Sequence, residues 1–398
     1  MHPPKPAARA AALVLALLVL STSATAQKDP MKFGKIENAM VGVTAFQADS
    51  NASAVVLGDF GSVEYSSSGE SLFERHTRIL ILNEAGYEHG TVELIHSNNR
   101  RITNLKGHTY VLNEDGKVVR HKLDKKAIFK DELDGDFERV RFTMPALAPG
   151  AVIEYTYKEK SEYPFFTHTW RFQRGEPTLW SEFRIQIPNF LEYGTLYRGR
   201  ENFAIRDENR FNRGGIRGTS FRWAIEDVPA LREEPYMTTP LDYVAQIRLQ
   251  LAAVNFRGVR EDVLGSWRSV AEALIDNPYI GDQIDKKKDV QSAVDEVLAG
   301  LPDTATPLQK MVAMYDWVRS SITWSETYGR DPDKSVREVL EQRTGNAASI
   351  NLTLLAMLRT AGLDVDPMLI STRSNGQASE QYPLVNQFNY FLAHVAIG

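Results

Sequence analysis

The sequence predicts an α+β protein in which a strand-rich part comes first and a helix-rich part follows. From about residue 53 to residue 255, apolar and polar residues alternate with a period of two, which is typical of half-buried strands. From about residue 263 onward the period changes to three and four, which is typical of amphipathic helices. The 398 residues are enough for two or three domains at about 150 residues each.

The strand-rich part is expected to form antiparallel sheets packed as a sandwich. Its clearest strands are residues 72–80, 153–157 and 243–251. Residues 109–112 and 117–119 flank a turn that ends at Gly116, where glycine supplies the positive φ of a hairpin. Many such strands with Gly, Pro and Asn between them favour a sandwich. The strand at 243–251 should bury Tyr243, Ala245, Ile247, Leu249 and Leu251.

The helix-rich part is expected to mix α and β. Residues 289–298 and a segment opened by Thr306 and Pro307 predict helices, since Thr is a good N-cap and Pro suits the first helical position. The expected apolar face of the second helix is Leu308, Val312, Tyr315, Val318 and Ile322. Residues 350–361 are apolar nearly all round and stop at Gly362, which indicates a buried helix. Strand-like residues 368–372 and 391–395 follow.

The first 26 residues are expected to be a signal peptide. Lys5 and Arg9 precede an apolar run, and Ala24–Ala26 gives the A-x-A pattern of a signal peptidase site. The run is about 11 residues long, whereas a membrane-spanning helix needs about 20, and no later stretch is long and apolar enough. We therefore expect a periplasmic or secreted protein of a Gram-negative bacterium. The change of period near residue 263 then predicts one domain in residues 27–262 and another in residues 263–398.

Composition narrows the possible chemistry. The chain has no cysteine, which excludes disulfides, thiolate metal sites and thiol nucleophiles. A net charge of −5 argues against a nucleic-acid partner. The sequence contains no zinc-protease, phosphate-loop, serine-hydrolase or dinucleotide motif, so we expect no metal and no cofactor. The acidic residues from Asp131 to Glu138 lack the spacing of a calcium loop and favour an exposed turn.

From Pro307 onward, the order of elements resembles the core of the transglutaminase-like superfamily. The resemblance rests on the aromatic strand at residues 322–324, on residues 336–347 with the pattern VLxxRxGx, and on residues 358–363 and 369–376. The strand-rich part, with residues 145–155, resembles the DUF3857 domain that precedes this core in a bacterial branch. The resemblance implies a papain-like α/β fold for residues 263–398 that is truncated at its C-terminal end.

In that superfamily, the nucleophile is a cysteine at the N-terminus of the buried helix, and a histidine on a following strand holds the proton. Ala347 and Tyr390 occupy these two positions here. The third group, an acidic residue on the next strand, would lie beyond Gly398. The resemblance therefore implies a transglutaminase-like domain without its catalytic residues.

Two functions remain open. The first is an exported, non-catalytic binding or scaffolding protein of the cell envelope, whose groove binds a peptide, a glycan or a protein. By analogy, Arg373, Asn389 and Tyr390 are its candidate binding residues. The second is an acyl-transfer or peptidase-type enzyme that uses other residues. Ser349 points about 200° away from Ala347 around a helix, and His394 lies about 13 Å along a strand from Tyr390, so neither is well placed for it.

Overall fold

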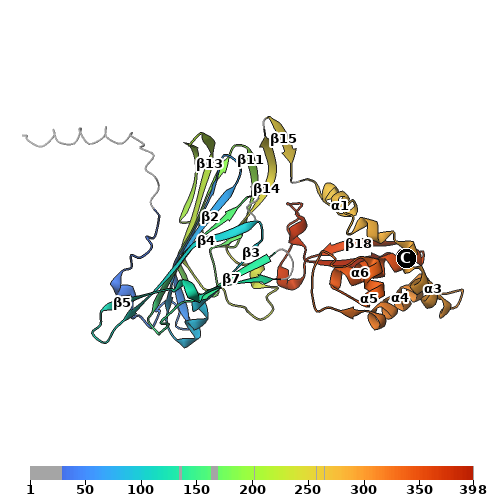
Figure 1. Cartoon of the computed structure of the whole chain (residues 1–398), viewed down its shortest axis with the longest axis horizontal. Helices are drawn as coiled ribbons and strands as arrows, with labels where there is room; N and C mark the ends of the chain where they lie inside the picture. The colour runs from blue at the N-terminus through green and yellow to red at the C-terminus, as the bar shows by residue number, and fades with distance from the viewer. Residues whose placement is uncertain are drawn as a thin grey trace, which may run out of the picture.

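The computed structural model describes residues 29–133, 137–162, 169–200, 202–256, 258–263 and 265–397. The expected signal peptide, residues 1–26, lies outside them. Figure 1 shows two parts side by side, one built of strands and one mainly of helices. We call residues 54–262 the β-rich domain and residues 267–397 the C-terminal domain. Among the described residues, no helix is both long and apolar enough to cross a membrane.

The largest sheet of the β-rich domain has eight strands in the order β12–β13–β10–β1–β2–β8–β4–β5. Neighbours are antiparallel except for β1 and β10, which run parallel. The predicted strands 72–80 and 153–157 lie in β2 and β8, and the predicted hairpin joins β4 to β5, with a φ of +71° at Gly116. The strands are β1 (Ala54–Tyr65), β2 (Ser71–Ile81), β4 (Arg100–Leu112), β5 (Val118–Lys122), β8 (Val152–Ser161), β10 (Thr178–Pro188), β12 (Ile205–Arg213) and β13 (Ile216–Val228).

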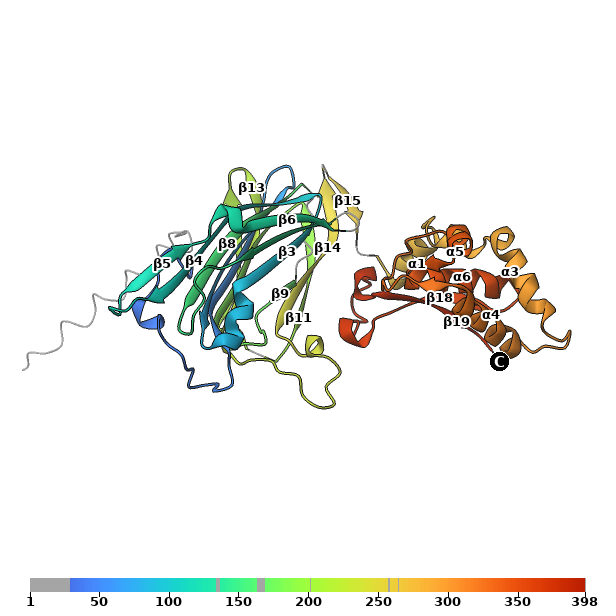
Figure 2. The ribbon, with the colours of Figure 1, turned by 60° about the horizontal axis from the view of Figure 1, so that its bottom comes forward.

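Two smaller sheets pack against one face of the large sheet (Figure 2). One contains β11 (Leu191–Arg198), β14 (Gln246–Phe256) and β15 (Val259–Asp262), with β9 (Thr169–Arg171) paired to β14. The other contains β3 (Thr91–Ser97), β7 (Phe137–Thr143) and β6 (Ile128–Leu133). Residues from all three sheets, such as Ile153, Phe142 and Ile247, share one core. The predicted sandwich is therefore confirmed, with one parallel pair of strands that the sequence did not indicate.

Four aromatic rings are stacked in a row inside the sandwich. The ring centres are 5.4 Å apart for Trp170 and Phe183, 6.1 Å for Phe183 and Trp223, and 5.4 Å for Trp223 and Phe221. Their planes lie within 16° of one another in each pair. The guanidinium of Arg75 lies 4.8 Å from the centre of Trp170 and covers the end of the row. The aromatic side chains of this part thus fill the core, which is their commonest use.

Asp59 is a buried charged residue in the interior of the sandwich. Its buried carboxylate accepts hydrogen bonds from Arg75, Arg174 and the Thr77 hydroxyl. Burial alone would raise the pKa of Asp59, but the charges of Arg174 and Arg75, together with the hydrogen bonds, lower it to about 2. The carboxylate is therefore charged and fully paired inside the sandwich.

The opposite face of the large sheet carries a second buried carboxylate, Glu154. It accepts hydrogen bonds from Arg78, from the Tyr110 hydroxyl at 2.8 Å and from the backbone N–H of Gly34 at 3.0 Å. Its Oε1 also lies 2.9 Å from Nε2 of His76. Burial alone would raise the pKa of Glu154, but the hydrogen bonds from His76 and Arg78 lower it to about 2. This cluster fastens the chain around residue 34 to the sheet.

The C-terminal domain is built around a central helix, α6. This helix packs against four other helices and both strands of the β18–β19 pair. Its side chains Leu352, Leu355 and Met357 are buried, and Gly362 follows with a φ of +82°, so the predicted buried helix is confirmed. The elements are α1 (Trp267–Ile275), α2 (Gly281–Ile284), α3 (Lys287–Ala299), α4 (Pro307–Ser321), β16 (Thr323–Trp324), α5 (Val336–Gln342), β17 (Thr344–Gly345), α6 (Ala347–Thr360), β18 (Val365–Ile370) and β19 (Tyr390–Val395).

Helix α4 begins as predicted but buries only part of the predicted face. Thr306 is its N-cap, in a capping box with Gln309, and Pro307 is its first residue. Val318 and Ile322 are buried as predicted, whereas Leu308, Val312 and Tyr315 are exposed and Met314 is buried in their place. The helix has two overlapping apolar stripes, because its methionines are also apolar. Packing against α3 and α6 buries the stripe that contains Met314.

Strand β14 starts later than predicted. Tyr243 does not belong to it, since the backbone N–H of Tyr243 closes a turn onto the carbonyl of Pro240. Its side chain is 40% exposed, contrary to the predicted burial. The other inward-facing residues, from Ala245 to Leu251, are buried as predicted.

Candidate functional site

The start of helix α6 is the position predicted for the family's nucleophile. Asn346 is the N-cap, and its side-chain oxygen accepts a hydrogen bond of 2.8 Å from the backbone of Ser349. Ala347 is the first helical residue and is 5% exposed. Gly345 precedes the cap, where a Cβ would lie only 3.1 Å from the Cβ of Ser349. The local sequence thus builds a tight entry into the helix and places a methyl group at its N-terminus.

The carbonyl oxygen of Thr327 covers this N-terminus. It accepts a hydrogen bond of 3.1 Å from the backbone N–H of Ala347 and another of 3.1 Å from the indole N–H of Trp324. Two N–H groups that converge on one carbonyl oxygen form the arrangement that stabilises a developing oxyanion in acyl-transfer enzymes. In this protein, the backbone carbonyl of Thr327 accepts both hydrogen bonds, so the two N–H groups are not free to bind a substrate oxygen.

Ser349 is used as a structural clamp. Its buried hydroxyl donates to Asp333 Oδ1 at 2.7 Å and accepts from the backbone N–H groups of Asp333 and Lys334, both at 3.0 Å. Burial alone would raise the pKa of Asp333, but hydrogen bonds from the N–H of Asn346 and the Ser349 hydroxyl outweigh it and lower the pKa below its ordinary value. A carboxylate with a lowered pKa is a poor base for activating a hydroxyl.

The structure places His394 near the end of β19, away from Tyr390 at its start. It lies towards the end of β19, opposite Asp366 of β18, and its side chain is exposed. Tyr390, at the start of the same strand, precedes Phe391, whose carbonyl accepts a hydrogen bond of 3.0 Å from Asn351 of α6. The pair Ser349 and His394 therefore does not form a nucleophile and base.

Tyr390 and two other aromatic residues form the edge of the site. The Tyr390 ring centre is 6.1 Å from that of Tyr328, and Tyr328 is 4.7 Å from Trp324. Asn351 Nδ2 donates to the carbonyls of Ala347 and Phe391, both at 3.0 Å, so β19 is held against the first turn of α6. We call Trp324, Tyr328 and Tyr390 the aromatic rim. Tyr328 is 68% exposed, so the rim offers ring surface to a ligand.

The other two candidate binding residues have structural contacts. The guanidinium of Arg373 donates to the backbone carbonyls of Met237 and Thr238 in the β-rich domain. The side chain of Asn389 bonds to the backbone N–H and the hydroxyl of Thr372, both at 2.9 Å. Of the three candidates, Tyr390 is the one that directly precedes Phe391, whose carbonyl shares the Asn351 donor with the carbonyl of Ala347. No sequence pattern predicts the roles of Thr327 and Tyr328, because a loop that folds back over a helix has no periodic pattern.

The segment that begins at Arg373 joins the two domains. Gln377 accepts a hydrogen bond from Arg198 at 2.8 Å through its carbonyl and donates its N–H to Asp242 at 2.6 Å. The hydroxyl of Tyr382 donates to the Thr195 carbonyl at 3.3 Å. We call residues 373–382 the docking segment, since they carry the contacts from the C-terminal domain to β11 and to the loop before β14.

The acidic stretch near residue 131 has ordinary contacts where it is described. Asp131 pairs with Arg139 at 3.1 Å in the β6–β7 hairpin, while Asp134 and Asp136 lie outside the described residues. Across the described ranges, no group of three or more histidine, aspartate or glutamate side chains is arranged to hold a metal ion.

Comparisons with solved structures support the fold. A candidate protease from Parabacteroides distasonis ATCC 8503 has a TM-score of 0.60 at 12% identity and matches 86% of this chain and 65% of its own. The chain thus spans about two thirds of that protein's length. An M1 zinc metallopeptidase from Deinococcus radiodurans has a TM-score of 0.23 at 8% identity, over 46% of this chain and 45% of its own. A native yeast LTA4 hydrolase has a TM-score of 0.24 at 11% identity, over 60% and 35%. These two scores are too low to carry an argument.

The family models identify both domains. Residues 67–232 match DUF3857, described as a domain of unknown function with solved structure, and residues 293–385 match the core of the transglutaminase-like superfamily. No curated protein sequence matches the chain. The chain contains no cysteine, in agreement with the loss of the superfamily's nucleophile. Residues 67–232 are thus similar to DUF3857 and residues 293–385 to the transglutaminase-like core, and the prediction that Ala347 and Tyr390 stand at the positions of the catalytic cysteine and histidine rests on the sequence motifs.

Proposed function

We propose that this chain is an exported, non-catalytic binding protein of the cell envelope, whose transglutaminase-like domain binds a peptide or glycan chain at the aromatic rim. The observation that carries the proposal is the start of α6. A methyl group stands at the nucleophile position, and the Thr327 carbonyl takes the N–H of Ala347 and the indole N–H of Trp324.

The chemistry of acyl transfer explains why this observation matters. The reaction needs a nucleophile, a base beside it and donors that are free to receive the negative charge of the intermediate. Ala347 cannot attack a carbonyl, Tyr390 carries a phenol where the superfamily has an imidazole, and the two donors are occupied. The start of α6 therefore lacks a nucleophile, a base beside it and free hydrogen-bond donors.

Binding at the rim is supported by exposed ring surface. Trp324, Tyr328 and Tyr390 come from β16, the loop after it and β19, and Trp324 is fixed by its bond to Thr327. Aromatic rings held in this way stack on apolar side chains and on the faces of sugar rings at a low entropic cost. The export part of the proposal is supported by the N-terminal sequence up to Ala26.

The test measures binding and turnover together. The protein from residue 27 onward is titrated with peptidoglycan fragments and with their stem peptides, and the mixtures are analysed by mass spectrometry for cleaved or transferred products. We expect binding without products. Tyr328→Ala should abolish the binding, whereas Tyr279→Ala, an equally exposed tyrosine between α1 and α2, should leave it unchanged.

Two results would contradict the proposal. Turnover that disappears in Ser349→Ala or His394→Ala would show that the chain is an enzyme acting through these residues. Retention of the full-length chain in the cytoplasmic fraction, with residues 1–26 still attached, would contradict export.

A further inference from the structure

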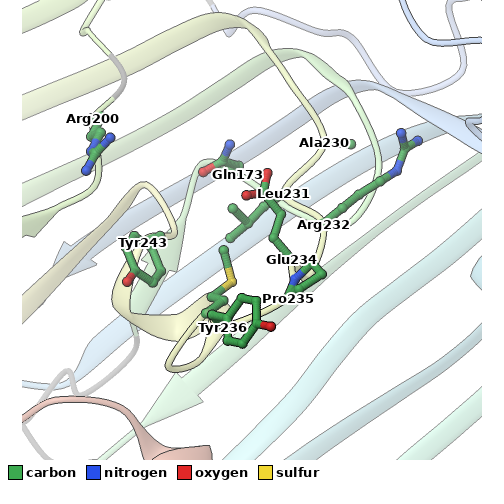
Figure 3. A pocket seen from close by; sticks show the side chains of 10 residues that line it. Gln173, Arg200, Ala230, Leu231, Arg232, Glu234, Pro235, Tyr236 and Tyr243 are labelled. Carbon is green, nitrogen blue, oxygen red and sulfur yellow. The ribbon is translucent and has the colours of Figure 1, made fainter.

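A cavity of about 640 Å³ lies beside residues 230–243 of the β-rich domain, and Figure 3 shows the side chains around it. Gln173 is a buried polar side chain in its wall. The Gln173 amide donates to the Pro229 carbonyl at 3.1 Å, and its oxygen accepts from the N–H of Ala245 at 3.2 Å. The chain itself therefore satisfies this side chain, and the cavity does not indicate a ligand. The free edge of β6, by contrast, has groups that indicate a partner.

Strand β6 is an edge of the three-stranded sheet β3–β7–β6. In the part of the chain that the structure describes, β7 is the one strand that pairs with it. Phe129, Lys130 and Glu132 of β6 are exposed. An exposed edge strand offers a row of unpaired N–H and C=O groups, onto which another strand can pair.

The pairing of β7 shows which backbone groups of β6 are free. The N–H of Met144, just after β7, donates to the carbonyl of Gly90, just before β3. Because the hydrogen-bonding groups of successive residues point to opposite edges of a strand, the even-numbered residues of β7 bond to β3 and the odd-numbered ones bond to β6. Their partners on β6 are residues 129, 131 and 133. The N–H and C=O groups of Lys130 and Glu132 therefore point away from β7, to the free edge.

The two charged side chains at this edge are not balanced by their own sheet. Neither Lys130 nor Glu132 forms an ion pair with another described residue. On β7, Glu132 lies opposite Glu138 and Lys130 lies opposite Val140. Like charges directly opposite each other are unfavourable. A strand that adds to this edge is therefore favoured if it brings a cation to Glu132 and an anion to Lys130.

We propose that β6 pairs with β6 of a second copy of this chain, antiparallel and about a two-fold axis at Asp131. The two three-stranded sheets then become one continuous sheet. Lys130 of each copy lies opposite Glu132 of the other, so each of these pairs exchanges two backbone hydrogen bonds and joins opposite charges. The same surface patch is used on both copies, as a two-fold interface requires.

The side chains of β6 select this register. Opposite side chains must share one face of the sheet, so a two-fold axis perpendicular to the sheet passes through a residue and not between two residues. An axis at Lys130 or Glu132 would place that residue opposite its own copy, with like charges facing each other. An axis at Phe129 would pair only three residues of the strand. At Asp131, each of the two facing carboxylates is already paired with Arg139 at 3.1 Å.

Apolar side chains lie on both sides of the axis. With the axis at Asp131, Phe129 lies opposite Leu133 of the second copy, and Phe137 of that copy lies beside this leucine on β7. Phe129 is 56% exposed and Phe137 is 49% exposed in the single chain. The pairing covers both rings and so removes apolar surface from water, which favours association.

The first test measures association by sedimentation equilibrium, with the protein from residue 27 onward at about 1 to 200 µM. We expect a dimer. Lys130→Glu and Glu132→Lys each place like charges opposite each other, so each should raise the dissociation constant at least about tenfold. The variant with both changes restores opposite charges and should return to within about threefold of the wild type. An equimolar mixture of the two single variants should form a heterodimer, since one strand then has two acids and the other has two lysines. The control is Lys122→Glu, an exposed lysine on the edge strand β5, which should change the constant by less than about twofold.

The second test uses the absence of cysteine from the chain. Residues opposite each other in a non-hydrogen-bonded pair have Cα atoms about 4.5 Å apart, which suits a disulfide. Asp131→Cys should therefore form a disulfide-linked dimer on mild oxidation. Glu114→Cys, an exposed position in the β4–β5 turn, should form one at least about tenfold more slowly. Circular dichroism and thermal unfolding confirm that each variant folds.

A protein that remains monomeric at about 200 µM would overturn the proposal. A dimer with the same dissociation constant in the wild type, Lys130→Glu and Glu132→Lys would also overturn it, because such a dimer forms through another surface. Equal crosslinking of Asp131→Cys and Glu114→Cys would contradict the axis at Asp131. Tyr328→Ala must leave the dimer unchanged, which separates this contact from binding at the aromatic rim.

Discussion

The carbonyl oxygen of Thr327 lies 3.1 Å from the backbone nitrogen of Ala347. This contact joins a loop that follows β16 to the first residue of α6. Because Trp324 donates to the same oxygen, the loop is held by two bonds at the place where a substrate carbonyl would have to enter. At the position predicted for the nucleophile, the two N–H groups that could receive an oxyanion are thus already bonded to the Thr327 carbonyl.

Ala347→Cys combined with Tyr390→His should produce a thiol with a lowered pKa. The N-terminus of α6 and the introduced imidazole both favour the thiolate, so its pKa should fall below about 8.5, the value of a free cysteine. The measurement is the pH dependence of alkylation by iodoacetamide. The control is Ser320→Cys, an exposed position near the end of α4. If the two thiols titrate at the same pH, residue 347 is not at the family's nucleophile position.

Ser349→Ala should destabilise the C-terminal domain without changing any activity. The variant leaves the N–H groups of Asp333 and Lys334 without their acceptor, which costs about 1–3 kcal/mol. Urea denaturation measures the loss, and Ser320→Ala, on the surface of α4, should change stability by less than about 0.5 kcal/mol. Unchanged stability would show that the clamp described for Ser349 is wrong.

Glu154→Gln should remove part of the acid sensitivity of the β-rich domain. The pKa of Glu154 is about 2 in the folded chain and 4.5 ordinarily, so the fold favours the charged form. Its contribution, about 3 kcal/mol, is fully present above pH 4.5 and is lost as the pH falls towards 2. The free energy of unfolding of wild type and variant, measured in urea between pH 6 and 2, should differ most at pH 6 and converge on acidification.

The control for this comparison is Glu114→Gln, an exposed residue in the β4–β5 turn, which should follow the wild type. Because Gly34 also bonds to Glu154, the Glu154→Gln variant should in addition be cut faster by trypsin at Lys32 and Lys35. Parallel pH curves for Glu154→Gln and the wild type would rule out the proposed linkage.

Arg373→Ala should loosen the loop of the β-rich domain that it holds. The variant loses its hydrogen bonds to the carbonyls of Met237 and Thr238. Hydrogen exchange should become faster at residues 239–244 and stay the same in β8. Arg319→Ala, an exposed arginine on α4, serves as the control. Unchanged exchange at residues 239–244 would mean that the loop keeps its conformation without the other domain.

The sequence predicted what depends on local pattern. The cap at Thr306 and the first residue Pro307 fix the start of α4, and the all-round apolar character of residues 350–361 identifies the central helix, because both follow from interactions within one segment. The sequence did not predict the full buried face of α4 correctly, because two faces of that helix are similarly apolar. The face of α4 was assigned to Leu308 although Met314 offers an equally apolar stripe, and only the position of neighbouring helices decides between them.

The site was predicted in part. Ala347 and Tyr390 were located by their place in a motif, and the structure brings them to the same end of α6. Arg373 was expected in the groove, yet its partners lie 135 and 136 residues earlier in the chain. The Thr327 carbonyl is a backbone group, which every residue has, so no side-chain pattern can announce its role.

The docking segment gives the C-terminal domain a second attachment to the β-rich domain, besides the covalent connection between β15 and α1. A body held at one point can swing in any direction, but a body held at two separate points can turn only about the line that joins them. The contacts of residues 373–382 therefore restrict how the C-terminal domain turns against the β-rich domain. A force that pulls the two domains apart would be carried by the docking segment as well as by the connecting chain.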